Sequence, residues 1–258
     1  MERIITAINP YRLDAGFLDN SFSCDIRRRP AVRKVRDLLM SNVRIIHGDS
    51  LEAIKAMPDK AYELAICDPP YGIGEDGKSN HSRGCLAETT KFIPKEWDRS
   101  RPTEDYFLNL RRVSTNQIIF GGNYFLEYLP STPCIIVWDK VNGKTDFADC
   151  ELAWTSFPSA VRQFRFQWQG MLQGDMKNKE KRIHPTQKPV ALYKWLLTKY
   201  AKPGDKILDT HGGSCSIAIA CDIMGFGCDI YEIDADYYKA AVERFERHKQ
   251  QTVLEFSA

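Results

Sequence analysis

From Val43 onward the chain alternates short apolar runs with longer segments bounded by helix start and stop signals. Such runs predict buried strands, and the longer segments predict helices that pack on them. The expected strands are 43–47, 62–67, 117–120, 134–139, 151–156, 161–168, 206–209 and 227–232. The expected helices are 50–58, 103–113, 189–201, 214–224 and 235–249, with Ser50, Thr103 and Ser214 as caps and Pro189 in a first turn. The alternation predicts an α/β fold, with a mostly parallel sheet covered by helices on both faces.

Two segments fall outside this pattern. Residues 1–40 show no clean period, which predicts an irregular or helical arm. Residues 72–101 are rich in Gly, Ser, Lys and Arg and lack periodicity. A loop of that length inside a compact domain is usually functional or mobile.

The composition narrows the class of protein. A chain of 258 residues with 43% hydrophobic and 27% charged residues is ordinary for a globular protein and can bury a full core. Its apolar runs are too short to span a membrane, and its first residues lack the layout of a signal peptide. The eight cysteines form no Cys-x-x-Cys pair. We therefore expect a cytoplasmic protein with reduced thiols and no metal site.

Charge is distributed unevenly along the chain, although the net charge is only +2. Arg27, Arg28 and Arg29 open one basic block, and 177–182 forms another after an aromatic and arginine-rich stretch. Solvated surface charge is the usual explanation for such blocks, and contact with nucleic acid phosphates is the competing one.

The most informative motif is Asp68-Pro69-Pro70-Tyr71, directly after the expected strand 62–67. Open α/β sheets bind ligands at the carboxyl ends of their strands. Two prolines stiffen the turn and leave its carbonyls free, between a carboxylate and an aromatic ring. An amino group needs hydrogen-bond acceptors and a flat base needs a stacking surface, and this turn offers both. An ordinary strand exit is the alternative interpretation.

A second motif, 209–216, follows the expected strand 206–209 and contains Gly212 and Gly213. A Gly-rich turn between a strand and a helix lets a ligand approach free backbone N–H groups. Glu232 ends the next strand, where an acid can accept both hydroxyls of a ribose. The spacing is neither the dinucleotide pattern of three glycines nor a phosphate loop, so S-adenosylmethionine fits best. A tight turn capped by Ser214 is the structural alternative.

With both motifs placed, the chain resembles the amino-group DNA methyltransferases, which act on adenine N6 or cytosine N4. The similarity covers most of 42–245. The matching segments are 47–52, 68–71, 118–125, 137–140, 151–156 and 184–189. The catalytic tetrad precedes the cofactor loop, which is the permuted order of the family's β group. The resemblance implies a Rossmann-like fold in which the helix ending near Lys249 leads in space toward the strand starting near Val43.

The resemblance also implies a division of the chain. We expect an arm at 1–41 and a methyltransferase domain at 42–258. Within that domain, 42–140 is the catalytic half, 141–183 a small target-recognition insertion, and 184–250 the cofactor-binding half.

Roles for individual residues follow from the same resemblance. Asp68, Pro69, Pro70 and Tyr71 are the expected catalytic residues, with Asp68 and the Pro69 carbonyl accepting the target amine and Tyr71 stacking on the base. The expected cofactor residues are Asp49, Lys188, Pro189, Asp209, His211, Gly213, Ser214, Cys215, Ser216, Glu232 and Ile233. Gly121, Gly122 and Asn123 shape the base pocket. Expected DNA contacts are Arg83, Lys91, Arg162, Arg165, Lys179 and Arg182. For Asp49, capping of the neighbouring helix is a second interpretation.

The implied function is site-specific methylation of adenine N6 in duplex DNA from S-adenosylmethionine, with base flipping, as in a restriction-modification system. Cytosine N4 is the alternative base, because both amines require the same chemistry. Two positions depart from the family pattern: His211 replaces an aromatic residue and Cys215 replaces a glycine. A side chain at 215 is expected to narrow the cofactor pocket, so a catalytically impaired DNA-binding module is a further alternative. The short recognition segment is compatible with a homodimer on DNA.

Overall fold

The computed structural model describes residues 42–74, 98–142, 148–169 and 172–255. Its strands are β1 (Val43–His47), β2 (Tyr62–Cys67), β3 (Ser114–Phe120), β4 (Ile135–Asp139), β5 (Cys150–Thr155), β6 (Arg162–Arg165), β7 (Trp168–Gln169), β8 (Leu172–Gln173), β9 (Lys206–Asp209) and β10 (Gly227–Glu232). Its helices are α2 (Ser50–Ala56), α3 (Glu104–Val113), η2 (Gly122–Tyr124, a 3₁₀ turn), α4 (Val190–Tyr200), α5 (Ser216–Met224) and α6 (Ala235–Glu255).

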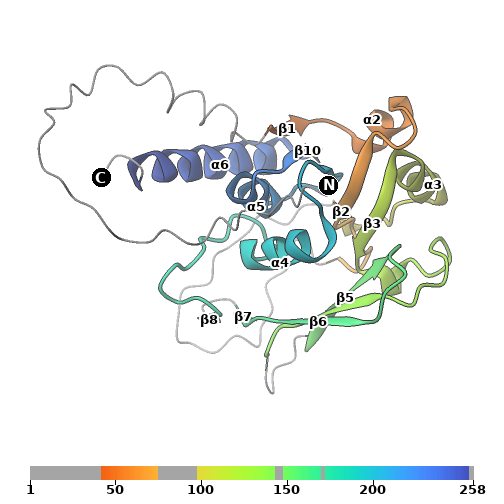
Figure 1. Ribbon diagram of the computed structural model, residues 1–258, viewed down its shortest axis with the longest axis horizontal. Coiled ribbons are helices and arrows are strands. Elements are labelled where there is room, and N and C mark those ends of the chain that lie inside the picture. Colours follow the sequence, from red (N-terminus) through yellow and green to blue (C-terminus); the bar gives the residue numbers. More distant parts are fainter. Residues whose placement is uncertain (1–41, 75–97, 143–147, 170–171, 256–258) are drawn as a thin grey trace, which may run out of the picture. The chain divides into compact units, whose positions relative to one another are not determined.

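Eight strands form one sheet in the order β1-β10-β9-β2-β3-β5-β4-β6 (Figure 1). All are parallel except β5, which runs antiparallel to both β3 and β4. From β9 the chain passes through α5 to β10 on one side, whereas from β2 it passes through α3 to β3 on the other. The strand order therefore reverses between β9 and β2. In open α/β sheets, this reversal point is where ligands bind.

Side chains alternate between the two faces of the sheet and build two cores. Leu64 and Ile66 of β2 face a core that includes residues of α4, α5 and α6. Ala65 and Cys67 face a second core with residues of α2 and α3. Because successive side chains of a strand point to opposite faces, strands buried on both sides read as continuous apolar runs. This confirms the predicted architecture of a parallel sheet covered on both faces.

Several boundaries differ from the sequence prediction. Asp49, not Ser50, caps α2, because its carboxylate accepts the N–H of Leu51 at 2.8 Å. Pro189 occupies the cap position of α4, whose first helical residue is Val190. The predicted strand 161–168 is two strands, β6 and β7, separated by Phe166 and Gln167. Other differences include an earlier start of β3, at Ser114, a later start of α5, at Ser216, and a longer α6, to Glu255.

A cluster of charged side chains links β1 to β10, β9 and β2. It lies away from the strand ends that carry the motifs. Asp229 of β10 receives two hydrogen bonds of 2.6 Å from Arg44 of β1, its register partner. It also accepts the Tyr62 hydroxyl at 2.7 Å and pairs with Lys206 at 2.9 Å. These donors lower the pKa of the buried Asp229 carboxyl to about 2, although burial alone would raise it. The cluster thus joins β1, β10, β9 and β2 through side chains.

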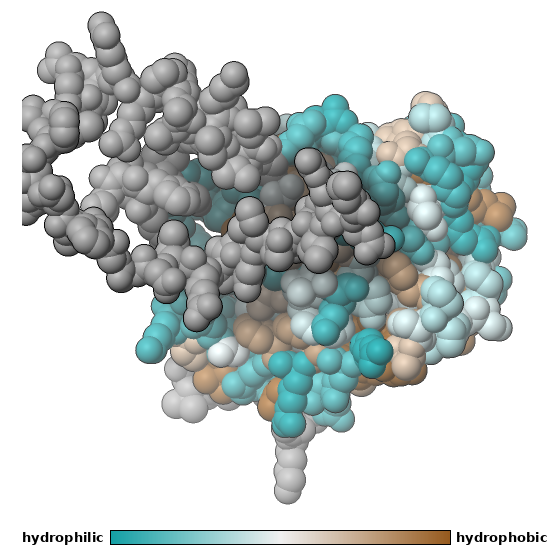
Figure 2. Space-filling view, viewed as in Figure 1, coloured by the Kyte–Doolittle hydropathy of each residue, from teal (hydrophilic) through white to brown (hydrophobic). Residues whose placement is uncertain are grey.

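The surface over α2 and α3 is mostly hydrophilic, with isolated hydrophobic residues (Figure 2). Leu108 of α3 is 50% exposed and Leu126 is 69% exposed. Single apolar residues of this kind are ordinary on soluble surfaces. Within the described ranges, no helix combines the length and apolar character that crossing a membrane requires.

Candidate active site

The two predicted motifs meet at the reversal point of the sheet. Asp68 directly follows β2, and Thr210 directly follows β9. These strands are parallel neighbours, with Leu64 opposite Ile207 and Ala65 opposite Leu208. The tetrad and the Gly-rich loop therefore leave the same edge of the sheet side by side.

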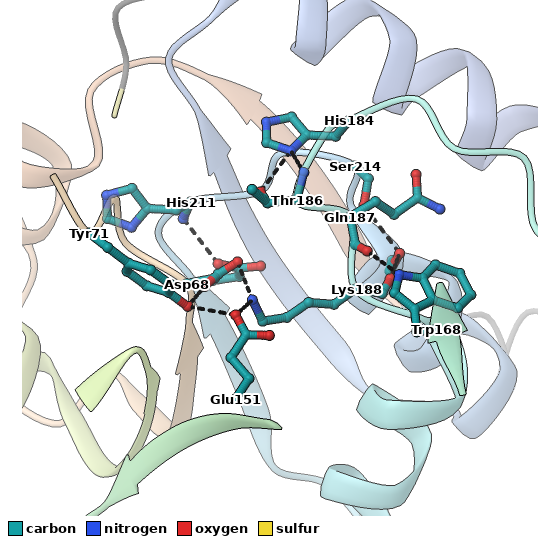
Figure 3. Close-up of polar contacts among 12 residues, drawn as sticks. Asp68, Tyr71, Glu151, Trp168, His184, Thr186, Gln187, Lys188, His211 and Ser214 are labelled. Atoms are coloured by element: carbon teal, nitrogen blue, oxygen red, sulfur yellow. Dashed lines mark hydrogen bonds and ion pairs between the residues drawn. The ribbon is translucent and has the colours of Figure 1, made fainter. Parts of the chain in front are cut away.

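The Asp68 carboxylate is the centre of a network of charged groups (Figure 3). Its Oδ1 accepts the Tyr71 hydroxyl at 2.6 Å, and its Oδ2 accepts the Lys188 ammonium at 2.7 Å. Lys188 Nζ also donates to Glu151 Oε1 at 3.1 Å. The Tyr71 hydroxyl lies 3.1 Å from the same Glu151 oxygen. Lys140 pairs with the other Glu151 oxygen at 3.3 Å. Two carboxylates and two ammonium groups thus balance each other in one cluster.

Burial and these neighbours set the protonation of the cluster. Burial raises the pKa of Asp68, against the opposing effect of Lys188. Burial would also raise the pKa of Glu151, but Lys188 and Lys140 lower it to about 2. A group with a displaced pKa at the end of a strand is a functional candidate, because catalytic sites commonly depend on such displacement.

The Tyr71 ring is held by the turn that follows β3. It stacks on Tyr124, with ring centroids 5.0 Å apart and planes 15° from parallel. Gly121 has φ 65, and a Cβ at this position would lie 2.2 Å from the Tyr71 ring. A Cβ at Gly122 would lie 2.5 Å from Trp154. The two glycines therefore make room for aromatic side chains beside the tetrad, whereas the predicted pocket residue Asn123 is exposed.

The loop after β9 wraps around the Glu232 carboxylate at the end of β10. Glu232 accepts the N–H of Gly213 at 2.6 Å and that of Asp234 at 2.8 Å. Burial raises the pKa of Glu232, and it raises the pKa of Asp209 to about 7. The loop, Asp209 and Glu232 thus form one surface next to Asp68. Of the other predicted cofactor residues, Asp49 is used as a helix cap and Ile233 is 63% exposed.

Cys215 occupies the position where the family pattern has glycine, and its backbone explains that preference. It has φ 51 and ψ 39, in the left-handed region, and forms the cap of α5. Its thiol is only 1% exposed and belongs to the core on the α5 side of the sheet. The predicted narrowing of the cofactor pocket stays a prediction, and burial of the thiol in the core argues against it.

We expect Cys215→Gly to bind S-adenosylmethionine with a Kd within about threefold of the wild type, a difference below about 0.7 kcal/mol. The substitution acts mainly on the free energy of unfolding. There, relief of about 1–2 kcal/mol of left-handed backbone strain is offset by the greater conformational freedom of glycine, about 0.5–1 kcal/mol, and by loss of the buried thiol. Isothermal titration calorimetry measures the affinity. A gain of tenfold or more would show instead that the Cys215 side chain obstructs the pocket.

His211 acts as a neutral aromatic residue. Its ring lies edge-on to Tyr106, with centroids 5.4 Å apart, and its Nδ1 is 2.9 Å from the Thr210 hydroxyl. Burial lowers the pKa of His211 to about 4, so the imidazole is uncharged at neutral pH. The departure from the family's aromatic residue therefore preserves an uncharged ring.

His211 also predicts a pH dependence of stability. Because its pKa is about 4 in the native state and about 6.5 in an unfolded chain, the unfolded state binds more protons between these values. This contribution to stability is complete above pH 6.5 and is lost as the pH falls toward 4. From pH 7 to pH 4, wild type should lose up to about 3 kcal/mol of unfolding free energy relative to His211→Phe. Urea denaturation across this range gives both curves, and parallel curves would contradict the assignment.

Lys188 joins the two motifs, although the sequence assigned it only to the cofactor pocket. Its side chain reaches Asp68, whereas its carbonyl accepts the Ser216 hydroxyl at 2.7 Å. Arg244 of α6 donates to that hydroxyl at 2.9 Å and to the Ser214 carbonyl at 2.7 Å. Glu151 lies in the matching segment 151–156 but was given no role, and Arg244 carried no local motif. Besides that match, an acidic residue in an otherwise apolar strand was the signal for Glu151.

Four of the six residues predicted to contact DNA lie in the described ranges. Arg162 and Arg165 lie exposed on β6, the edge strand of the sheet, and Arg165 pairs with Asp139 at 3.5 Å. Lys179 is exposed, whereas Arg182 is partly buried with its guanidinium 5.3 Å from the centroid of the Trp168 ring. Arg83 and Lys91 lie outside the described residues. In the part of the chain that the structure describes, no three His, Cys, Asp or Glu residues are placed to hold a metal ion.

Comparison with known proteins finds a family match and two similar methyltransferases. Residues 135–243 match the profile of the N6/N4 family described as DNA methylase. The type II methyltransferase M.HinfI of Haemophilus influenzae is 23% identical over 250 residues, covering 80% of this chain and 68% of that protein. The type II methyltransferase M.HpaI of Haemophilus parainfluenzae is 25% identical over 244 residues, covering 79% and 74%. Over residues 135–243 the chain is therefore similar to the amino-group DNA methyltransferases.

The family match confirms the resemblance carried by the sequence motifs. The match indicates a DNA methyltransferase of the adenine-N6 or cytosine-N4 type, and the two relatives are type II methyltransferases. Its fold matches the solved structure of the PvuII cytosine-N4-specific DNA methyltransferase with a TM-score of 0.54 and 13% identity. That match covers 82% of this chain and 91% of the PvuII enzyme. It confirms the predicted methyltransferase fold.

Proposed function

We propose that this chain methylates the N6 amine of adenine at a specific sequence in duplex DNA, on a base rotated out of the helix. The observation that carries the proposal is the position of the Asp68 carboxylate beside the 210–215 loop, at the reversal point of the sheet. Aspartate in the first tetrad position supports adenine over cytosine. Base flipping is required because the amine is not accessible inside the stack.

The residues around the loop fit S-adenosylmethionine. A carboxylate can accept about four hydrogen bonds. Glu232 receives two from backbone N–H groups, which leaves capacity for two ribose hydroxyls. Asp209 accepts the His211 N–H on Oδ1, and among the described residues no hydrogen bond reaches its Oδ2. Asp209 and the Gly213 backbone would hold the methionine end. When bound, the cofactor supplies an electrophilic methyl group.

The tetrad would orient and activate the amine. The lone pair of an exocyclic amine is delocalised into the base, which makes the nitrogen a poor nucleophile. Asp68 and the Pro69 carbonyl would each accept one N–H and draw the nitrogen toward tetrahedral geometry, which localises the lone pair. Such catalysis rests on orientation and electrostatics. After transfer, Asp68 is the nearest acceptor for the proton that leaves the nitrogen.

The Asp68 contacts indicate where the amine would bind. Lys188 holds Oδ2, whereas Oδ1 is held by the Tyr71 hydroxyl. A neutral hydroxyl is exchanged more readily than a buried ammonium, because hydrogen bonds between charged partners are stronger. The amine would therefore bind at Oδ1, in place of or beside the Tyr71 hydroxyl. The Tyr71 ring would stack on the base.

Analysis of the reaction product tests this function. Plasmid DNA from a methylation-deficient host is incubated with the full chain and S-adenosylmethionine, digested to nucleosides and examined by mass spectrometry. We expect N6-methyladenine, and single-molecule sequencing of the same DNA gives the target site. Detection of N4-methylcytosine instead would show that cytosine, not adenine, is the target base. Absence of both products, with cofactor binding retained, would contradict the proposal.

A further inference from the structure

The cluster around Asp68 holds two residues to which the reaction described above assigns no role. Glu151 comes from β5, the one antiparallel strand of the main sheet, and Lys188 comes from the segment before α4. Both are remote from Asp68 in sequence, yet they join it in one hydrogen-bonded chain (Figure 3). The question is what the pair does for the carboxylate.

Lys188 is held too firmly to be an incidental surface partner. Its side chain is 3% exposed, against 18% for Asp68 and 17% for Glu151. Its Nζ lies 2.7 Å from Asp68 Oδ2, 3.1 Å from Glu151 Oε1 and 4.5 Å from the centroid of the Phe120 ring. Two carboxylates and an aromatic face therefore fix the position of the ammonium group. A buried lysine is costly unless it is paired in this way.

The arrangement also fixes the Asp68 carboxylate. The ammonium holds Oδ2 and leaves Oδ1 as the oxygen that meets the target amine. Without Lys188, two carboxylates linked through the Tyr71 hydroxyl would remain in one buried site. Like charges at such separation share a proton, because both cannot ionise readily. A protonated Asp68 is a poorer acceptor for the amine and for its departing proton.

We propose that Lys188 and Glu151 are a positioning pair, in which Glu151 orients the Lys188 ammonium and the ammonium keeps Asp68 ionised with Oδ1 directed at the target amine. This inference rests on the proposed function, because the amine is the group that Asp68 would accept. Neither residue touches the substrate in this scheme, and both act through Asp68.

The titratable groups near Asp68 come from several elements. They are Tyr71 in the turn, Glu151 of β5 with Lys140 after β4, Lys188 and Tyr193 on the α4 side, and Asp209 at the end of β9. Lys188 opposes protonation of Asp68, whereas Glu151 favours it. Removing one or the other charge therefore changes the pKa of Asp68 in opposite directions. A purely structural role would not produce opposite changes.

The test measures the Asp68 pKa directly in the full-length protein. Carboxyl ¹³C NMR of aspartate-labelled protein follows the titration, and Asp68→Asn identifies the signal. We expect Lys188→Met to raise the pKa by about 1–3 pH units, the usual effect of losing an opposite charge within 4–6 Å, and Glu151→Gln to lower it. The matched control is Lys206→Met, since Lys206 also pairs with a buried carboxylate and lies 4.5 Å from the centroid of a tyrosine ring, at Asp229 and Tyr62. It should leave the Asp68 pKa unchanged.

Methyl-transfer kinetics give the second measurement. The acidic limb of kcat/KM on plasmid DNA should move in the direction of the Asp68 pKa, with kcat affected more than KM. Equal or absent pKa changes in the two variants would overturn the pairing, even if wild type is active. Opposite pKa changes in a protein that transfers no methyl group would refute the proposed function and retain the pairing. If circular dichroism shows that Lys188→Met is unfolded, the change of the Asp68 pKa in Glu151→Gln tests the pair instead. A lower pKa supports the proposed pair, and an unchanged or higher pKa overturns it.

Discussion

Replacing Asp68 with asparagine should lower the rate of methyl transfer by about 10²–10⁴-fold, the usual contribution of a positioned acid–base group. Asparagine has the shape of aspartate and keeps one acceptor oxygen, but it has no charge to stabilise the developing positive charge or to take the proton. It also leaves Lys188 paired with Glu151 alone. The loss of rate should appear in the chemical step, because the flipped base can still stack on the Tyr71 ring.

Single-turnover transfer of a tritiated methyl group to plasmid DNA measures this step, and fluorescence anisotropy with a mixed-sequence duplex measures DNA binding. Asp59→Asn is a suitable control, since Asp59 pairs with Arg112 at 2.8 Å but has a side chain 75% exposed. We expect the control to transfer at the wild-type rate and both variants to bind DNA as wild type does. A rate within tenfold of wild type for Asp68→Asn would remove Asp68 from the mechanism.

Replacing Glu232 with alanine should raise the Kd for S-adenosylmethionine by about 10²-fold or more. A hydrogen bond to a charged group contributes about 1.5–3 kcal/mol, and each factor of ten in affinity corresponds to about 1.4 kcal/mol. The substitution removes the proposed ribose acceptor and also the acceptor of the Gly213 and Asp234 N–H groups. Loop and cofactor contacts are therefore lost together.

Calorimetry on Glu232→Ala, Glu232→Gln and a control separates these effects. Glutamine keeps one acceptor oxygen, so we expect an affinity between those of wild type and alanine. Glu63→Ala is the control, because Glu63 is an exposed carboxylate that also accepts a backbone N–H, that of Lys206 at 2.8 Å. Wild-type affinity in Glu232→Ala would place the ribose elsewhere.

The strand exits could be predicted from sequence because local chemistry specifies them. A buried apolar run followed by Pro69 and Pro70, or by Gly212 and Gly213, ends a strand wherever that strand lies in the sheet. The structure places both motifs at such exits. The cap of α2 was predicted one residue late because Asp49 and Ser50 are both good cap residues, and only geometry distinguishes them.

The charged network could not be predicted, because it depends on strand order. Glu151 reaches Asp68 only because β5 inserts between β3 and β4, and no local pattern specifies that insertion. Lys188 was expected near the cofactor, and its carbonyl accepts a hydrogen bond from Ser216, directly after the proposed cofactor loop. The direction of its long side chain is set by two carboxylates from other parts of the chain.

The Asp229 cluster has a consequence for how this architecture can be rearranged. β1 and β10 are joined by strand pairing and by the two hydrogen bonds from Arg44 to Asp229. The backbone does not connect α6 to β1, because they are the last and the first elements of the described chain. The segments that hold the proposed catalytic and cofactor residues therefore associate at this point without a covalent link. Exchanging their order in a gene, or expressing them from two genes, would preserve every neighbour in the sheet.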